Sequence, residues 1–400
     1  MFTTTKSLSP ITTTVIVILT LAAFIISAGI YPLFVKIAKR HGVYDTPDSR
    51  KLQKAPVPVL GGVVVAIGIF VPLMVAVFVY DLPNLRTSLF VMAALVTIGV
   101  IDDICNLSAV LRFCMEFVII GFLCIYTGLA IKEFFGLFGI GTLNNYIAIP
   151  LSLVAGVGII NAINLIDGVD GYSSGYGILA NTFFAIIFFS VHEQVWGLFS
   201  IICAAALLPF FLHNVFGKKS KMYIGDGGSL LIGCIMVLDV FSLLRAGSFS
   251  GTILASMGVS VVALSLAVLC IPVFDTLRVM FTRILHKTSP FKPDRTHLHH
   301  LFIDMGFSHV GTALSILISN LLVIMLWWLS YRLGMPLEVQ FSIVVLLGFL
   351  MTFVYYPVMR RGQRKNNAVW RFMQAVGKHT HFENNRTWQY IQKIVDYGPF

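Results

Sequence analysis

The sequence predicts an all-α integral membrane protein that crosses the bilayer about eleven times. Of its 400 residues 57% are hydrophobic and only 12% are charged, and the mean hydropathy is +0.88. Apolar runs long enough to span a bilayer recur along nearly the whole chain. This composition overrules the two or three soluble domains that the length alone would suggest.

The predicted spans have uncertain ends, because several of them are shorter than twenty residues. They lie near residues 13–35, 58–80, 86–101, 112–131, 146–163, 176–191, 195–212, 229–244, 252–274, 311–331 and 338–358. A polar loop, residues 275–310, separates spans nine and ten and should be extended where its prolines lie. Residues 1–359 then form one transmembrane domain. Residues 360–400 form a basic cytoplasmic tail, as an interfacial helix or as a disordered segment.

The distribution of positive charge predicts the orientation. The net charge of +10 could suggest a nucleic-acid partner, but the 28 Lys and Arg are sorted between alternate loops. Five lie on one side (Lys6, Arg86, Lys132, Arg245 and Arg332) and all the others lie on the opposite side. The positive-inside rule places the rich side in the cytoplasm and the N-terminus outside, in the periplasm. The polar motifs described next all fall on the cytoplasmic side.

Two adjacent carboxylates, Asp102 and Asp103, end the third predicted span. Neighbours on a helix point about 100° apart, so the pair is poorly placed to chelate one ion together. Their repulsion favours a shared proton, which suits a catalytic base. The alternative is a helix-end pair balanced by Arg112.

Amides and carboxylates gather at the end of the fifth span. Asn161, Asn164 and Asp167 recur every third residue and share a helix face, and the glycines that follow turn Asp170 in another direction. Such groups can read a base or a sugar through paired donors and acceptors. The alternative is an Asn-rich helix end with a glycine stop.

A glycine-rich turn, Gly225-Asp226-Gly227-Gly228-Ser229, directly precedes the eighth span. Free amides at a helix start favour phosphate, and Gly225 and Gly227 permit a close approach. Asp226 would repel a diphosphate unless a metal ion lay between them. Tyr223 offers a stacking ring just before the turn. Taken alone, a short glycine-rich turn is better read as an ordinary loop.

A basic motif, Asp294-Arg295-Thr296-His297-Leu298-His299-His300, lies in the long polar loop. It could be a zinc site, but it has no neighbouring cysteine and no helical HExxH pattern. Arg295 with His297, His299 and His300 is better suited to clamp a phosphate.

Taken together, these motifs resemble one family. Their order is Asp-Asp, Asn-x-x-Asn-x-x-Asp-Gly-x-Asp-Gly, Gly-Asp-x-Gly-Ser, Pro-x-x-Asp-Thr (Pro272–Thr276) and Asp-Arg-x-His-x-His-His. This pattern is similar to the polyprenyl-phosphate N-acetylhexosamine-1-phosphate transferases, and the histidine motif resembles their WecA type. The resemblance runs from about residue 30 to 330.

The resemblance implies a multi-pass protein of the bacterial inner (cytoplasmic) membrane with a cytoplasmic active site. It implies transfer of N-acetylhexosamine-1-phosphate, with N-acetylglucosamine expected, from a UDP-sugar to undecaprenyl phosphate. UMP would leave, Mg²⁺ or Mn²⁺ would be the cofactor, and the product would start a cell-surface glycan such as O-antigen. No nucleic acid is expected, and a homodimer is compatible with the family.

The same resemblance implies a role for each motif residue. Asp102, Asp103 and Asp226 would be catalytic, Asp226 and Asp102 would hold the metal, and Arg112 and Lys51 would meet the lipid phosphate. The nucleotide would lie among Asn161, Asn164, Asp167, Asp170 and Tyr223. The sugar diphosphate would lie at Arg295, His297, His299, His300, Gly225 and Gly227. One departure is Gln53, where relatives commonly carry a histidine.

Two other functions fit parts of the pattern. A transporter of an anionic solute would place ionisable groups within the spans, where Glu116 and Asp239 are among the few candidates. A metal-dependent lipid phosphatase would share the carboxylates but would have no need of Asn161 and Asn164.

Overall fold

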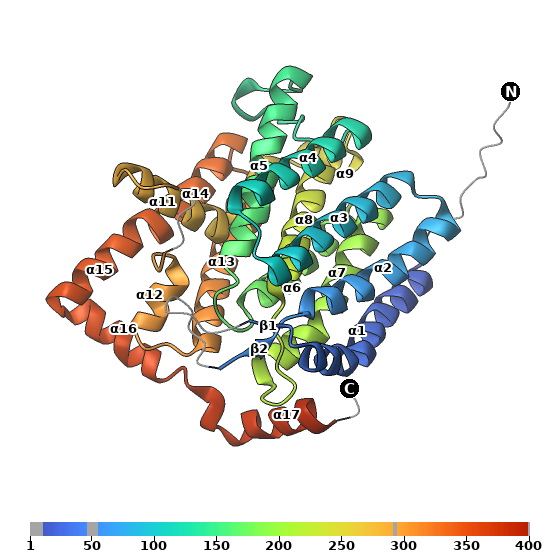
Figure 1. Cartoon of the computed structure of the whole chain (residues 1–400). Coiled ribbons are helices and arrows are strands. Elements are labelled where there is room, and N and C mark those ends of the chain that lie inside the picture. The colour runs from blue at the N-terminus through green and yellow to red at the C-terminus, as the bar shows by residue number, and fades with distance from the viewer. Residues whose placement is uncertain (1–10, 46–54, 291–293, 399–400) are drawn as a thin grey trace, which may run out of the picture.

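The computed structural model describes residues 11–45, 55–290 and 294–398, and it confirms the predicted all-α fold. Helices form a bundle in which most axes run in roughly the same direction (Figure 1). Within the described residues, the strands are β1 (Tyr44–Asp45) and β2 (Val57–Pro58), which pair antiparallel.

Ten helical segments of the described chain are long and apolar enough to cross a membrane. The last of them, Leu337–Lys365, joins α14 (Leu337–Phe349), a π-helical turn (Leu350–Val354) and α15 (Tyr355–Lys365). The other nine are α1 (Thr13–His41), α2 (Gly61–Tyr80), α3 (Pro83–Cys105), α4 (Ala109–Thr127), α5 (Asn145–Leu165), α6 (Tyr172–Ser190), α7 (Gln194–Phe216), α8 (Gly225–Leu244) and α13 (His309–Arg332).

The predicted ninth span, residues 252–274, is not one helix, which corrects the sequence analysis. It is divided into α9 (Phe249–Ser256) and α10 (Val261–Val268), bent by 110°, and the start of α11 (Cys270–Leu285). Gly258 adopts φ +84 at the bend. The freed backbone groups are satisfied by Gln340 of α14, which donates to the Gly258 carbonyl (2.8 Å) and accepts from the Ser260 amide (3.0 Å). Counted as one crossing, this pair brings the total to eleven.

The tail is helical over most of its described length. It contains α16 (Ala368–Lys378), a 3₁₀ turn (Phe382–Asn384) and α17 (Arg386–Tyr397). In Figure 1 the tail runs below the bundle, at the end where β1 and β2 lie. Two further short elements are the 3₁₀ turn Leu137–Gly139 and α12 (Leu298–Asp304).

Helix α8 forms the centre of the bundle, with every residue from Gly227 to Leu244 buried. Glycines allow the neighbouring helices to approach its backbone. A Cβ on Gly99 of α3 would lie 2.4 Å from the Gly227 Cα, and a Cβ on Gly62 of α2 would lie 2.2 Å from the Gly228 amide nitrogen. These contacts fix the start of α8 against α2 and α3.

The alternating direction of the helices brings the predicted motifs to one end of the bundle. The last turns of α3 and α5 meet the first turns of α8 and α13 there. The chain leaves this end through α8 and returns through α10 and α11 to α12. The motifs are therefore gathered by topology, although they are far apart in sequence.

Candidate active site

A cavity of about 360 Å³ lies where these helix ends meet. Aspartates dominate its wall: Asp45 of β1, Asp102 and Asp103 of α3, Asp167 and Asp170 after α5, and Asp226 of α8. The other residues that line it are Tyr44, Val59, Asn106, Asn164, Gly168, Val169, Asn214, Tyr223, Ile224, Gly225, His300 and His309. An acid-rich cavity of this kind requires cations or protons to be stable, which favours a metal or a cationic partner.

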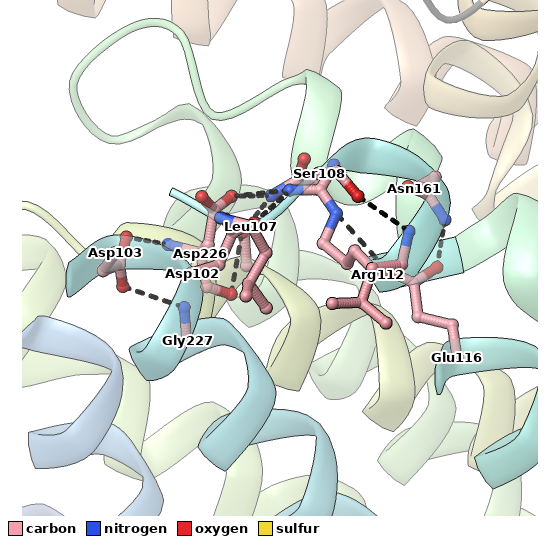
Figure 2. Close-up of polar contacts among 12 residues, drawn as sticks. Asp102, Asp103, Leu107, Ser108, Arg112, Glu116, Asn161, Asp226 and Gly227 are labelled. Atoms are coloured by element: carbon pink, nitrogen blue, oxygen red, sulfur yellow. Dashed lines mark hydrogen bonds and ion pairs between the residues drawn. The ribbon is translucent and has the colours of Figure 1, made fainter. Parts of the chain in front are cut away.

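Asp103 caps the amino end of α8. Its carboxylate accepts hydrogen bonds from the backbone amides of Asp226 (2.8 Å) and Gly227 (3.1 Å), as Figure 2 shows. Gly225 adopts φ +70, and a Cβ there would lie 2.4 Å from a carboxylate oxygen of Asp103. The sequence analysis expected these amides to be free for phosphate. In the structure the Gly227 amide already donates to Asp103, so it is not free to bind a diphosphate.

Arg112 joins Asp102 to Asp226. Its Nη1 lies 2.7 Å from Asp102 Oδ2 and 3.6 Å from Asp226 Oδ1 (Figure 2). The second oxygen of Asp102 accepts from the Leu107 amide at 2.7 Å, which ties the end of α3 to the turn before α4. Arg112 thus partly neutralises both carboxylates. The alternative given in the sequence analysis, a helix-end carboxylate balanced by Arg112, is present for Asp102.

Behind this cluster, Asn161 and Glu116 form a buried pair. The Asn161 amide donates to Glu116 Oε2 and to the Val157 carbonyl (2.9 Å). The Arg112 Nε lies 3.7 Å from Glu116 Oε1. Asn161 does not line the cavity, so it is placed to support Arg112 through Glu116 and not to touch a nucleotide held there.

Asn164 and Asp167 lie in the cavity wall as the sequence predicts. The Asn164 amide donates to Asp226 Oδ1 and to Ser229 Oγ (2.8 Å), which orients the Asp226 carboxylate. Asp167 accepts a hydrogen bond from Ser173. Burial, chiefly, raises the pKa of Asp167 to about 7, and the negative charges of Asp226 and Asp170 add to the shift.

Asp170 has two basic partners. Its Oδ2 lies 2.6 Å from Lys221 Nζ and 3.1 Å from His309 Nδ1. Burial favours the neutral acid, but the hydrogen bond from His309 and the charge of Lys221 outweigh it and lower the pKa of Asp170. His309 was not singled out from the sequence. It lies 139 residues from Asp170, and only its place beside the Ser308 cap of α13 could have drawn attention to it.

Tyr223 also lines the cavity and is fixed through its backbone. Its amide donates to the Pro58 carbonyl (2.8 Å), and its carbonyl accepts from the Gly61 amide (3.0 Å). Asn214, also absent from the predicted set, accepts from the Gly171 amide (2.7 Å) and donates to the Met222 carbonyl (3.1 Å). It therefore links the loop of Asp170 to the segment of Tyr223.

The histidine motif only partly reaches the cavity. His300 lines it, whereas Arg295 is exposed and His297 and His299 are buried outside the wall. Asp275 of the Pro-x-x-Asp-Thr motif holds this loop: its Oδ2 lies 3.0 Å from His297 Nδ1 and accepts from the Leu298 amide (3.1 Å). Arg278 pairs with the other oxygen at 2.6 Å. Asp275, which is missing from the predicted set, thus positions the histidine loop.

Two histidines of this motif have lowered pKa values. Burial, followed by the repulsion of its neighbours, lowers the pKa of His299 well below its usual range. The same causes, with Arg295 as the nearest cation, lower the pKa of His300 to about 4. These rings are neutral near pH 7, so they can offer a hydrogen bond to a phosphate but no positive charge. Lys51 and Gln53 lie outside the described residues.

The donors in the cavity suit a hard cation. Among the described residues no group of three or more His, Cys, Asp or Glu is preassembled as a metal site. Mg²⁺ needs no such cage, because it usually binds one or two carboxylates together with substrate phosphates and water. Asp226 and Asp102, both beside Arg112 Nη1, supply carboxylates of that kind.

Comparison with known proteins confirms the resemblance predicted from the motifs. The family model described as "Glycosyl transferase family 4" matches residues 85–245. A probable undecaprenyl-phosphate N-acetylglucosaminyl 1-phosphate transferase of Bacillus subtilis is 29% identical over 70% of this chain and 75% of its own length. The corresponding Yersinia pestis protein is 26% identical over 86% and 93%. A decaprenyl-phosphate N-acetylglucosaminephosphotransferase of Mycobacterium tuberculosis is 29% identical over 82% and 85%.

Proposed function

We propose that this protein transfers N-acetylglucosamine-1-phosphate from a UDP-sugar to a polyprenyl phosphate. The observation that carries the proposal is the aspartate-lined cavity at the end of a transmembrane bundle, built from the motifs described in the sequence analysis. The named activities of those relatives support the sugar and the lipid acceptor. The concentration of Lys and Arg in the loops on one side of the membrane supports a cavity that opens to the cytoplasm.

In this reaction an oxygen of the acceptor phosphate attacks the sugar-bound phosphorus of the donor. The bond between that phosphorus and the bridging oxygen breaks, and UMP leaves with the bridging oxygen. Phosphoryl transfer depends mainly on positioning and on neutralising charge. A phosphomonoester has a second pKa near ~6, so the acceptor is mostly dianionic at pH 7 and needs no strong base.

The residues around Asp226 supply the positioning. Asn164 orients the Asp226 carboxylate, and Asp103 fixes the backbone that carries it. Mg²⁺, when bound at Asp226, would neutralise the diphosphate. Arg112 is not itself in the cavity wall, but its Nη1 lies beside the wall carboxylates Asp102 and Asp226, which supports a role for this cation toward the acceptor phosphate. Asp102 therefore orients Arg112 and need not remove a proton.

The opposite side of the cavity is suited to the nucleotide. Tyr223 offers an aromatic face, and a base can stack on it. Asp170 is held ionised between Lys221 and His309 and can accept hydrogen bonds from a base or ribose. Asn164, which donates to Asp226, and Asp167 line the same cavity, and we expect the diphosphate to lie near them.

The test is an assay of purified protein with undecaprenyl phosphate, Mg²⁺ and UDP-N-acetylglucosamine. UMP should appear only when both substrates are present, and EDTA should abolish it. UDP-N-acetylgalactosamine and UDP-glucose in place of the donor report sugar selectivity. UMP release without lipid would indicate a hydrolase, and solute uptake into proteoliposomes without UMP would indicate a transporter.

A further inference from the structure

The C-terminal segment from Thr380 to Asp396, here called the strap, contacts the end of the bundle that holds the cavity. It contains the last 3₁₀ turn and α17, and in Figure 1 it passes below β1 and β2. The Trp388 ring packs on Phe216 at the end of α7, with ring centroids 4.4 Å apart. None of the predicted motifs includes this segment.

The strap is attached first at the loop after α7. The Asp396 carboxylate accepts from three consecutive backbone amides, those of Lys218 (3.1 Å), Lys219 (3.0 Å) and Ser220 (3.0 Å). It also accepts from the Ser220 hydroxyl at 2.8 Å. Successive amides that converge on one anion are a strong, directional arrangement. On the other side of the loop, Tyr31 of α1 donates to the Ser220 carbonyl at 3.0 Å.

The second attachment is at the start of α13. The Ser308 amide donates to Thr380 Oγ1 at 3.0 Å, and the Ser308 hydroxyl donates to the Thr380 carbonyl at 2.6 Å. Gly311 allows this contact, because a Cβ there would lie 2.3 Å from the Thr380 side chain. The strap therefore joins two loops that come from different parts of the bundle.

Both attachments lead to the same carboxylate. Ser220 is followed directly by Lys221, and Ser308 is followed directly by His309. Lys221 and His309 are the two partners of Asp170 Oδ2, at 2.6 Å and 3.1 Å. Each end of the strap thus holds a backbone one residue away from a side chain that sets the charge and orientation of Asp170.

We propose that the strap positions Lys221 and His309 around Asp170, so that Asp396 and Thr380 are positioning residues for the nucleotide side of the cavity. The proposal rests on the function proposed above, because it takes Asp170 and Tyr223 as the nucleotide region. Loosening either attachment lets Lys221 or His309 leave Asp170. The side chains of the nucleotide region are then no longer held in place. Asp102 on α3, Arg112 on α4 and Asp226 on α8 keep their positions, because their own helices hold them.

The test is steady-state kinetics with varied UDP-N-acetylglucosamine. Asp396→Ala is expected to raise the KM for this donor about tenfold while kcat changes about twofold or less, the pattern of lost binding common to ground and transition states. Asp396→Asn keeps one carbonyl oxygen for the amides and should have a smaller effect. Thr380→Val removes the acceptor for the Ser308 amide and should also raise the donor KM, and Thr380→Ser should restore it.

Arg386→Ala is the control, because Arg386 is an exposed charged residue of the strap that lies between the two attachments. It should leave the donor KM unchanged. Hydrogen exchange provides a readout independent of activity: amides 217–223 should exchange faster in Asp396→Ala, and amides 306–311 faster in Thr380→Val. Unchanged exchange, or faster exchange with an unchanged donor KM, overturns the proposal. Absence of UMP from the wild-type protein would overturn the proposed function instead, and the exchange experiment would still judge the strap.

Discussion

At the scale of single residues, the carboxylates of the cavity have different roles because their partners differ. Asp103 is occupied by two backbone amides, Asp102 by Arg112 and an amide, and Asp170 by Lys221 and His309. Among the described residues, Asp226 accepts from the Asn164 amide and has Arg112 at 3.6 Å. These few partners support the proposal that Asp226 holds the metal ion.

Replacing Asp226 tests that assignment. Asp226→Asn keeps the shape but removes the charge, and transfer should fall at least ~100-fold, on the scale of losing one strong electrostatic contact in a transition state. Raised Mg²⁺ should restore part of the rate, because the variant binds the ion more weakly but keeps the arrangement of the site. A titration of initial rate against Mg²⁺ measures both effects.

The control is Asp239→Asn, on the same helix but bonded to Ser200 far from the cavity. It should retain activity at ordinary Mg²⁺. Near-normal activity of Asp226→Asn would remove the metal assignment, and equal rescue of an Asp102→Asn variant would show that both carboxylates share the ion.

Asp167 makes stability depend on pH. Its pKa is about 7 in the folded protein against an ordinary value of 3.8, so folding favours its protonated form. This contribution to stability is complete at low pH and is lost as pH rises from about 4 through 7. Asp167→Asn stays neutral, so its melting temperature should exceed that of the wild type by more at pH 8 than at pH 5. Equal differences in thermal scans at both pH values would contradict the shift.

Residue identities in the site were largely predictable, but their contacts were not. Local spacing brings Asn164, Asp167 and Asp170 together, since they lie on one short stretch. No local pattern shows that Asn161 turns to Glu116, or that His309 meets Asp170. Those contacts depend on which helices become neighbours, which is decided by packing over the whole bundle.

At the scale of elements, Gly227 and Gly228 in the first turn of α8 serve helix packing. The sequence analysis expected Gly225 and Gly227 to approach a ligand, whereas the structure brings Gly227 against Gly99 of α3. A glycine-rich turn looks the same in sequence whether a phosphate or a helix approaches it. The position of Asp226 therefore depends on the distance between α3 and α8.

Gly99→Ala tests this dependence. Its Cβ would meet the backbone of α8 at 2.4 Å, which cannot yield as a side chain can. Overpacking of this kind costs about 1–3 kcal/mol, so the melting temperature should fall and activity should fall with it. Gly158→Ala on α5 is the matched control, because nothing lies within 4 Å of a Cβ there. Thermal scans and UMP assays compare the two variants. Equal effects would contradict a dependence of stability and activity on the close contact between α3 and α8.

At the scale of the whole molecule, hydropathy predicted the crossings well because the apolar runs are long and the loops between them are polar. It missed the break between α9 and α10, since Gly258 and its partner Gln340 change the backbone path without changing the hydrophobicity of the segment. The number of crossings is preserved, because the chain still returns to the cavity end before α12.

The orientation of the molecule is open to direct measurement. In a Cys105→Ser, Cys114→Ser background, which removes the exposed native thiols, cysteines at Lys219 and Lys287 should react with an impermeant maleimide only from the cytoplasmic face. A cysteine at Asn84 should react only from outside. We expect this orientation because the positive-inside rule places the loops that are rich in Lys and Arg in the cytoplasm. Labelling of Lys219 from the outside would place the cavity on the wrong face for a nucleotide-sugar.

The burial of α8 has a consequence for how the protein responds to its bilayer. Helices α1 and α4 are each only 22% buried over their apolar windows, so they adjust to changes in hydrocarbon thickness by tilting. Helix α8 touches no lipid between Gly227 and Leu244. Thickness mismatch is absorbed at the periphery, and the helix that carries Asp226 is insulated from it. The same chemistry can therefore run in thin and in thick membranes without a change in the geometry of its central carboxylate.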